Sequence, residues 1–169
     1  MRTRLTVVAA GLAMLAATVS GQPRQVDLIV RTAIVVTMDA SSRVLPRGAV
    51  VIDAGRIVAV EPSNAIAARY VATETIDADG LVVLPGLINT HTHAPMVLYR
   101  GLADDLALMV WLEKYIFPAE AKTVTPEFVR AGTRLAALEM IQSGTTTYAD
   151  MYYFEEEIAR VTRDAGLRG

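Results

Sequence analysis

The stretch LPGLINTHTHAPM, residues 84–96, contains both histidines of this 169-residue chain, His91 and His93. They stand one residue apart at the end of a short apolar run. Side chains at positions i and i+2 of a strand point to the same side, so the two imidazoles are predicted to project together while Thr92 points the other way. Two adjacent imidazoles can bind one metal ion. The alternative is an ordinary polar strand end with two hydrogen-bonded histidines.

The composition limits the kinds of site that this chain can hold. It has no cysteine, which excludes disulfides, thiol nucleophiles and cysteine-ligated metals, so a metal would be bound by His, Asp or Glu. A formal net charge of −2 and a pI near 5.7 indicate no nucleic-acid surface and no polybasic membrane patch. The length suits one domain, or one domain with a small appendage.

Residues 1–21, MRTRLTVVAAGLAMLAATVSG, have the layout of a secretory signal peptide. Two arginines precede an apolar stretch from Leu5 to Val19, and cleavage is expected after Ser20 or Gly21. The apolar stretch is shorter than the roughly 20 residues that span a bilayer. We therefore expect an exported protein, periplasmic or secreted, without a stable membrane anchor after cleavage. An uncleaved anchor and a misassigned start codon are the alternatives.

Between Val26 and Leu84 the sequence is typical of β-strands. Asp, Gly, Ser and Pro separate short branched runs, namely DLIV, AIVVTMD, GAVVIDAG, RIVAVEP and LVVL. The stretch DAGR at 53–56 predicts a hairpin turn, in which Gly55 is free to adopt a positive φ, and DADG at 77–80 predicts a second turn. No helical period is visible. We expect a small antiparallel sheet that needs a partner surface for stability.

From Leu87 onward the pattern changes to strand, helix, strand and helix. In TPEFVRAGTRLAALEMIQSG, a helix is predicted to begin at Thr125, with Pro126 at its first position, and to end at Gly144. Its predicted apolar face consists of Phe128, Ala131, Leu135, Leu138 and Ile141.

The stretch TTTYADMYY that follows predicts a strand, and FEEEIARVTRDAG predicts a second amphipathic helix ended by Gly166. Strands that alternate with helices indicate βαβ units and a parallel sheet, which is an α/β fold. The active sites of α/β barrels lie at the C-terminal ends of the strands, where His91 and His93 are expected.

Three stretches, LPGLINTHTHAPMVLYRGLADDL, WLEKYIFPAE and GTTTYADMYY, resemble the amidohydrolase superfamily. The branch they resemble most contains 5-methylthioadenosine/S-adenosylhomocysteine deaminases and triazine chlorohydrolases, and the string HTHAPM is specific to it. The resemblance runs from Asp27 to the last residue and implies a metal-dependent hydrolase with a (β/α)8 barrel beside a small β-sandwich. Residues 22–84 would then form the N-terminal portion of the sandwich, and residues 85–169 the first two βα units of an incomplete barrel.

The resemblance also implies roles for individual residues. His91 and His93 match the first two ligands of one divalent metal ion, usually Zn²⁺. Glu120, in FPAE, matches a glutamate that binds substrate, typically through ribose hydroxyls; without the resemblance it would be taken as an exposed charge near a helix start. Trp111 matches a loop segment that borders the pocket, and a purely structural aromatic is an equal alternative.

Three further acidic residues carry no assigned chemistry. Asp104 and Asp105 are expected in a solvated loop, and Asp150, near the end of the second strand, is expected to form hydrogen bonds within the barrel. No catalytic residue is predicted within this chain.

The expected function is that of a hydrolase acting on non-peptide C–N bonds, most specifically a deaminase of adenosine-type or related small heterocyclic substrates that uses metal-activated water. A catalytic zinc site takes three protein ligands, and the chain has no third histidine. We therefore expect the N-terminal portion of a longer hydrolase, inactive on its own. The alternatives are another amidohydrolase chemistry, such as a chlorohydrolase or a cyclic amidase, and a non-enzymatic exported domain. The sequence sets no oligomeric state.

Overall fold

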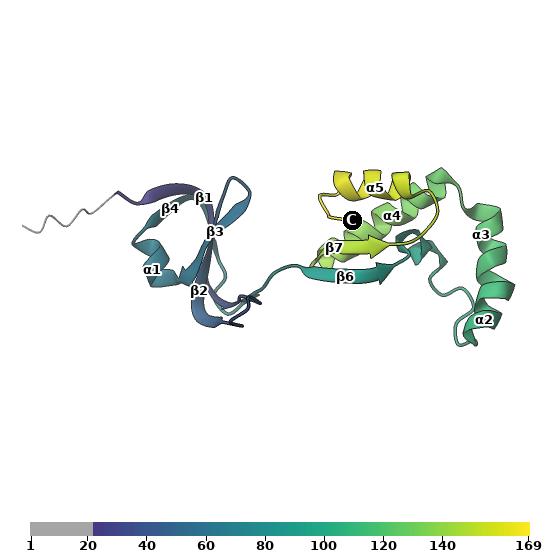
Figure 1. Cartoon of the computed structure of the whole chain (residues 1–169), viewed down its shortest axis with the longest axis horizontal. Coiled ribbons are helices and arrows are strands. Elements are labelled where there is room, and N and C mark those ends of the chain that lie inside the picture. Colours follow the sequence, from purple (N-terminus) through teal and green to yellow (C-terminus); the bar gives the residue numbers. More distant parts are fainter. Residues whose placement is uncertain (1–21) are drawn as a thin grey trace, which may run out of the picture. The chain divides into compact units, whose positions relative to one another are not determined.

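The computed structural model describes residues 22–169, which fall into two compact units divided between Leu84 and Pro85 (Figure 1). The predicted signal peptide, residues 1–21, lies outside the described residues. Within residues 22–169, none of the helices combines the length and the apolar character that a membrane crossing requires.

The first unit is built on one five-stranded sheet. Its elements are β1 (Arg24–Val36), β2 (Val44–Asp53), β3 (Arg56–Pro62), the short helix α1 (Ser63–Ala67), β4 (Tyr70–Asp77) and β5 (Val82–Val83). The strand order is β3-β2-β1-β4, with β5 also paired to β1. β1 runs antiparallel to β2 but parallel to β4 and β5. The prediction of an antiparallel sheet is therefore right for β1, β2 and β3 and wrong for β4 and β5. The crossover through α1 returns β4 in the same direction as β1.

Both predicted turns of this unit are confirmed. Between β2 and β3, Ala54 and Gly55 both have positive φ, 50° and 71°, as a two-residue hairpin turn requires. The carboxylate of Asp27 accepts a hydrogen bond of 2.8 Å from the Ala54 amide, which helps to fix the turn. At the second turn, Gly80 has φ 75°. The sequence therefore specified the chain reversals more closely than the strand directions.

Buried side chains lie on both faces of β2, where Ala49, Val50 and Val51 are all buried, whereas β3 and β4 are largely exposed. Two predicted runs, DLIV and AIVV, form the single strand β1, which is irregular between Val30 and Ala33, where Thr32 has φ 64°. One cluster of buried side chains contains Val26, Ile29, Ala49, Val51 and Ile66, and another contains Ala33, Val35, Val50 and Ala78. A second sheet, which the expected sandwich would need, is not among the elements of residues 22–84.

The second unit contains two parallel strands covered by helices. Its elements are β6 (Leu87–Thr92), the 3₁₀ helix η1 (Ala94–Tyr99), α2 (Leu108–Trp111), the π-helical η2 (Leu112–Ile116), α3 (Phe117–Thr123), α4 (Pro126–Gln142), β7 (Thr145–Asp150) and α5 (Glu155–Asp164). β6 pairs with β7 in parallel, which confirms the predicted arrangement (Figure 1). β7 ends at Asp150, so the predicted strand TTTYADMYY is three residues too long.

Helix α4 begins and ends as its sequence predicts. The Thr125 side chain accepts a hydrogen bond from the Phe128 amide, Pro126 occupies the first helical position, and Gly144 follows the helix with φ 82°. The predicted apolar face is wrong, however, because Leu135, Leu138 and Ile141 are 37%, 53% and 51% exposed. The buried residues are Val129, Gly132, Thr133, Ala136 and Ala137.

Small side chains on this face allow η1 to pack directly on α4. A Cβ atom added to Gly132 would lie 2.5 Å from the carbonyl oxygen of Pro95 and 2.7 Å from its Cα. The backbone that follows His93 therefore touches α4 without an intervening side chain. The core of the unit contains Ala94, Val129, Ala136, Tyr148 and Ile158.

Candidate functional site

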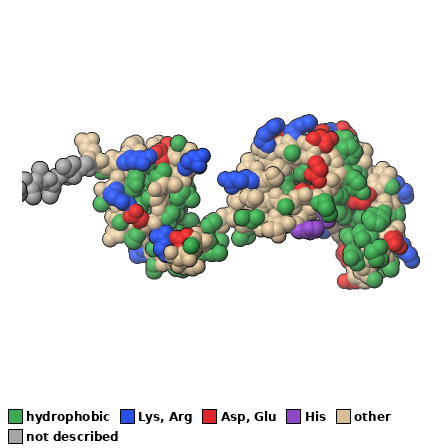
Figure 2. Space-filling model, in the orientation of Figure 1, with side chains coloured by type: hydrophobic (Ala, Val, Ile, Leu, Met, Phe, Trp, Pro, Cys, Tyr) green, Lys and Arg blue, Asp and Glu red, His purple; other side chains and the backbone are tan. Residues whose placement is uncertain are grey.

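The two histidines lie together at the C-terminal end of β6, as the sequence predicts. His91 belongs to the strand, and His93 directly follows it and precedes η1. Their ring centroids are 4.9 Å apart, and the ring planes meet at 81°. Figure 2 shows the histidines at the surface, beside hydrophobic side chains that gather over α2 and α3. The two rings can therefore present nitrogen atoms to the same small region.

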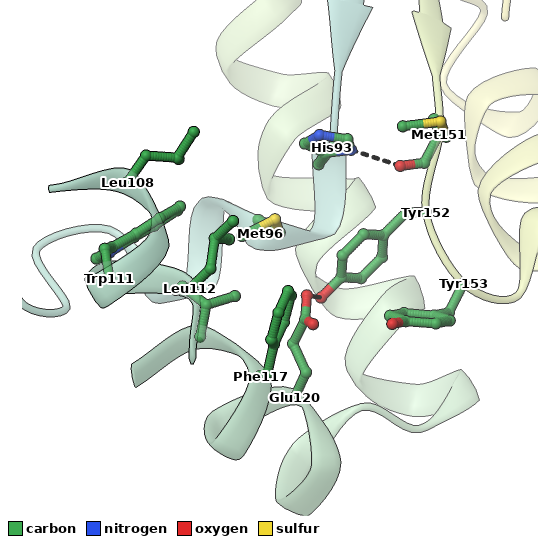
Figure 3. A pocket seen from close by; sticks show the side chains of 11 residues that line it. His93, Met96, Leu108, Trp111, Leu112, Phe117, Glu120, Met151, Tyr152 and Tyr153 are labelled. Carbon is green, nitrogen blue, oxygen red and sulfur yellow. Dashed lines mark hydrogen bonds between the residues drawn. The ribbon is translucent and has the colours of Figure 1, made fainter. Parts of the chain in front are cut away.

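The orientation of His93 is fixed by the neighbouring strand end. Its Nδ1 forms a hydrogen bond with the backbone carbonyl of Met151 (Figure 3). A carbonyl oxygen only accepts hydrogen bonds, so the neutral ring carries its proton on Nδ1 and keeps the lone pair on Nε2. Histidines that bind metals are typically held in this way, with the other ring nitrogen donating to a carbonyl or carboxylate.

Two more hydrogen bonds connect the end of β7 to the residues that flank His93. The Met151 amide donates to the carbonyl of Thr92 over 3.1 Å, and the Ala94 amide donates to Oδ2 of Asp150 over 2.8 Å. Asp150 thus forms the kind of hydrogen bond that the sequence led us to expect. Its Oδ1 is buried and has no hydrogen-bond partner among residues 22–169. Burial raises the pKa of Asp150, and the hydrogen bond from Ala94 opposes that rise.

The fit of a metal ion can be judged from the donor atoms. Imidazole nitrogen is a normal ligand of Zn²⁺, and Nε2 of His93 has the required free lone pair. Within residues 22–169, however, no group of three or more His, Asp or Glu side chains could hold an ion together. The described residues therefore fit two ligands of a metal site and do not complete it.

A cavity of about 490 Å³ adjoins His93. Its polar lining also includes Glu120 and the hydroxyl of Tyr152, while the rest of the wall is aliphatic and aromatic (Figure 3). These other lining residues are Met96, Leu108, Trp111, Leu112, Ile116, Phe117, Met151 and Tyr153. A mainly apolar cavity of this size with a few polar groups is typical of a small-molecule site.

Trp111 is part of this wall, but it does not lie in a loop. It ends α2, which continues through η2 into α3, so the prediction of a loop is wrong. This helix was not predicted from the sequence because proline normally interrupts an α-helix. Pro118 lies near the start of α3. The indole Nε1 donates a 3.0 Å hydrogen bond to the carbonyl of Leu102. Trp111 therefore both lines the cavity and fastens the preceding segment.

Glu120 is half-buried in the wall formed by α3, rather than an exposed charge. Its Oε1 accepts a 2.7 Å hydrogen bond from the hydroxyl of Tyr152, a residue that the sequence analysis did not single out. Tyr152 could have been predicted as a site residue from its position two residues after Asp150, just beyond a parallel strand. The active sites of α/β barrels lie at these strand ends. Asp104 and Asp105 are both exposed, as expected of a solvated segment.

Several known proteins are similar to this chain in sequence or in fold. A 5-methylthioadenosine/S-adenosylhomocysteine deaminase of Syntrophobacter fumaroxidans is 55% identical over 142 residues, which are 84% of this chain and 32% of that protein. A zinc-bound adenosine deaminase structure from Xanthomonas campestris has a TM-score of 0.84 and 41% identity, and the match covers 87% of this chain and 34% of that one. An atrazine chlorohydrolase structure from Arthrobacter aurescens has a TM-score of 0.73 and 25% identity, covering 83% and 34%.

These relatives confirm the predicted likeness to both the deaminases and the triazine chlorohydrolases. The chain spans about a third of the length of the curated relatives that it matches. The Amidohydrolase family model matches residues 82–168, from β5 to the second-last residue of the chain. Since this match covers just over half of the 169 residues and includes the histidine pair, the chain belongs to the amidohydrolase family.

Proposed function

We propose that this chain supplies the first part of the active site of a metal-dependent hydrolase that deaminates adenosine-type substrates. The observation that carries the proposal is His93, which lines the cavity, lies beside His91 and has its Nδ1 bonded to the Met151 carbonyl. That hydrogen bond leaves the lone pair of Nε2 free to bind a metal ion. The names of the relatives support deamination as the reaction.

Each part of the described site has a place in this proposal. His91 and His93 would hold the metal, for which Zn²⁺ is the natural candidate because it accepts imidazole and is bound in the related adenosine deaminase structure. Zinc held there would lower the pKa of a bound water toward about 7 and so supply a hydroxide nucleophile. Glu120 would accept hydrogen bonds from ligand hydroxyls such as those of a ribose. The aromatic and aliphatic wall would pack against the remainder of a small heterocyclic ligand.

The activity is proposed for a protein that contains further metal ligands. A catalytic zinc takes about three protein ligands, and the described residues offer two. Residues 22–169 alone are therefore expected to show no turnover. We further propose that β6 and β7 are the first two strands of a (β/α)8 barrel and that the first unit is part of a β-sandwich. Export to the periplasm or beyond is proposed from residues 1–21 alone.

Dechlorination of a triazine is the second candidate, and the likeness to the atrazine chlorohydrolase favours it. It ranks below deamination because this chain is 25% identical to that protein but 41–55% identical to the deaminases named above. The two reactions differ in their leaving group, ammonia in one case and chloride in the other.

The test uses the zinc-loaded product of the complete reading frame. Adenosine, 5′-deoxyadenosine, 5′-methylthioadenosine and S-adenosylhomocysteine are assayed for ammonia release, and atrazine for chloride release. We expect ammonia from at least one nucleoside, with activity and bound zinc both lost in His91→Ala and His93→Ala. Asp104→Asn, at an exposed carboxylate, serves as the control. Zinc content that does not change in either histidine variant, or chloride release without ammonia release, would overturn the proposal.

A further inference from the structure

Tyr152 joins the two polar parts of the cavity wall. It follows Met151, whose carbonyl holds His93, and its own hydroxyl reaches across to Glu120 on α3. The hydroxyl oxygen and Oε1 of Glu120 are 2.7 Å apart, although the two residues are 32 positions apart in the sequence. Figure 3 shows the phenol ring pointing into the cavity toward this carboxylate. The two residues that follow β7 therefore contact His93, just after β6, and Glu120 on α3.

The surroundings of Tyr152 hold it in this orientation. Its amide donates a 2.8 Å hydrogen bond to Oε1 of Glu155, and its ring packs edge-on against Tyr153 with centroids 5.1 Å apart. The ring of His93 lies 6.3 Å away on the side of the strand pair. The hydrogen bond of its amide and the packing of its ring against these neighbours restrict the orientation of the Tyr152 side chain.

Among the residues that the structure describes, the Tyr152 hydroxyl is the group that holds the Glu120 carboxylate. Within residues 22–169, no arginine or lysine forms an ion pair with Glu120, and the Tyr152 hydroxyl is its hydrogen-bond partner. Burial raises the pKa of Tyr152, and the adjacent carboxylate raises it further, so the phenol stays protonated and donates. A hydrogen bond to a charged acceptor is stronger than one between neutral groups.

We propose that Tyr152 is a positioning residue that orients the Glu120 carboxylate for a hydroxyl-bearing ligand, with Oε1 bonded to the phenol and Oε2 left to accept from the ligand. The inference rests on the proposed function, in which Glu120 contacts the ligand. Without the phenol hydroxyl, the Glu120 side chain is free to change rotamer, and the ligand has to order it on binding. The loss should therefore be specific to ligands that carry the hydroxyls.

The kinetic test compares two substrates in the zinc-loaded product of the complete reading frame. Adenosine carries the 2′- and 3′-hydroxyls of the ribose, and 2′,3′-dideoxyadenosine lacks these two. For Tyr152→Phe we expect KM for adenosine to rise roughly tenfold, with kcat and the KM for the dideoxy substrate little changed. The double variant with Glu120→Gln should lose no more than Glu120→Gln alone, because both changes remove one coupled interaction. Tyr115→Phe, at an exposed tyrosine outside the cavity lining, is the matched control.

Equal losses for both substrates, or additive losses in the double variant, would overturn the positioning role. Urea unfolding of the 169-residue chain tests the contact independently of activity. Because Tyr152 and Glu120 share one hydrogen bond, the double variant should shift the unfolding midpoint by less than the sum of the shifts in Tyr152→Phe and Glu120→Gln. Additive shifts would mean that the contact is absent in solution. A wild-type protein that shows this coupling but releases no ammonia would instead overturn the proposed function.

Discussion

The imidazole of His93 and the backbone carbonyl of Met151 form a hydrogen bond between residues that are 58 positions apart in the sequence. The bond joins the first strand of the parallel pair to the end of the second. Thr92 and Ala94, on either side of His93, are also bonded to the end of β7. The orientation of His93, a proposed metal ligand at the end of β6, is thus set by contacts with the end of β7, and β6 alone would not fix it.

The first prediction concerns the tautomer of His93. Because Nδ1 donates to a carbonyl, the neutral ring should carry its proton on Nδ1 and leave Nε2 unprotonated. Long-range ¹H–¹⁵N spectra of the metal-free chain at pH about 8.5, above the usual titration range of histidine, report this directly. The chain has two histidines, so the spectrum of His91→Asn assigns both rings. A ring protonated on Nε2 would contradict the structure.

A second prediction tests how α4 positions the turn after His93. Replacing a helical glycine by alanine normally stabilises a protein by roughly 0.5–1 kcal/mol. At Gly132 the added methyl group would meet the backbone of Pro95 at 2.5 Å, so Gly132→Ala should instead destabilise the fold by about 1–3 kcal/mol. Urea unfolding measures the change, and Ala131→Ser, at the exposed neighbouring position, is the control. A stabilised Gly132→Ala variant would show that η1 does not lie against α4.

The third prediction concerns the start of α4. The Thr125 side chain accepts the 3.2 Å hydrogen bond from the Phe128 amide, which caps the first turn. Thr125→Ala should therefore lower the free energy of unfolding by about 1 kcal/mol, while Thr125→Ser, which keeps the hydroxyl, should change it little. Chemical denaturation of both variants provides the comparison. Equal losses in the two would indicate that the methyl group, and not the cap, stabilises this position.

Such local features were predictable from the sequence because the interacting residues are close in the chain. The cap at Thr125, the turn at Ala54 and Gly55, and the helix stop at Gly144 each depend on a few consecutive residues. The placement of His91 and His93 on one side of the β6 end is similarly local, because it follows from the two-residue period of a strand.

The features that were missed depend on contacts between distant residues. The apolar face of α4 was predicted from apolar residues at helical spacing, whereas the buried face is the one that Pro95 approaches, next to Gly132. The contact of Tyr152 with Glu120 similarly requires β7 and α3 to be placed in space. A pattern of residue types along the chain contains no such distance, so the cavity wall could be predicted only in part, through the family resemblance at Glu120 and Trp111.

The last prediction concerns Tyr148, which is buried in β7 with its hydroxyl bonded to that of Thr162. Burial raises its pKa above the ordinary value of 10.0. Above pH 10 the unfolded chain therefore releases a proton that the folded chain retains, and the free energy of unfolding should fall as the pH rises. Tyr148→Phe removes the contribution of this tyrosine to the fall in the free energy of unfolding above pH 10. At pH 7 it should cost only about 1 kcal/mol, because the Thr162 hydroxyl still donates to the Ile158 carbonyl. Urea unfolding from pH 7 to 11 should show the difference between variant and wild type shrinking above pH 10, and a constant difference would mean that Tyr148 titrates normally in the folded protein.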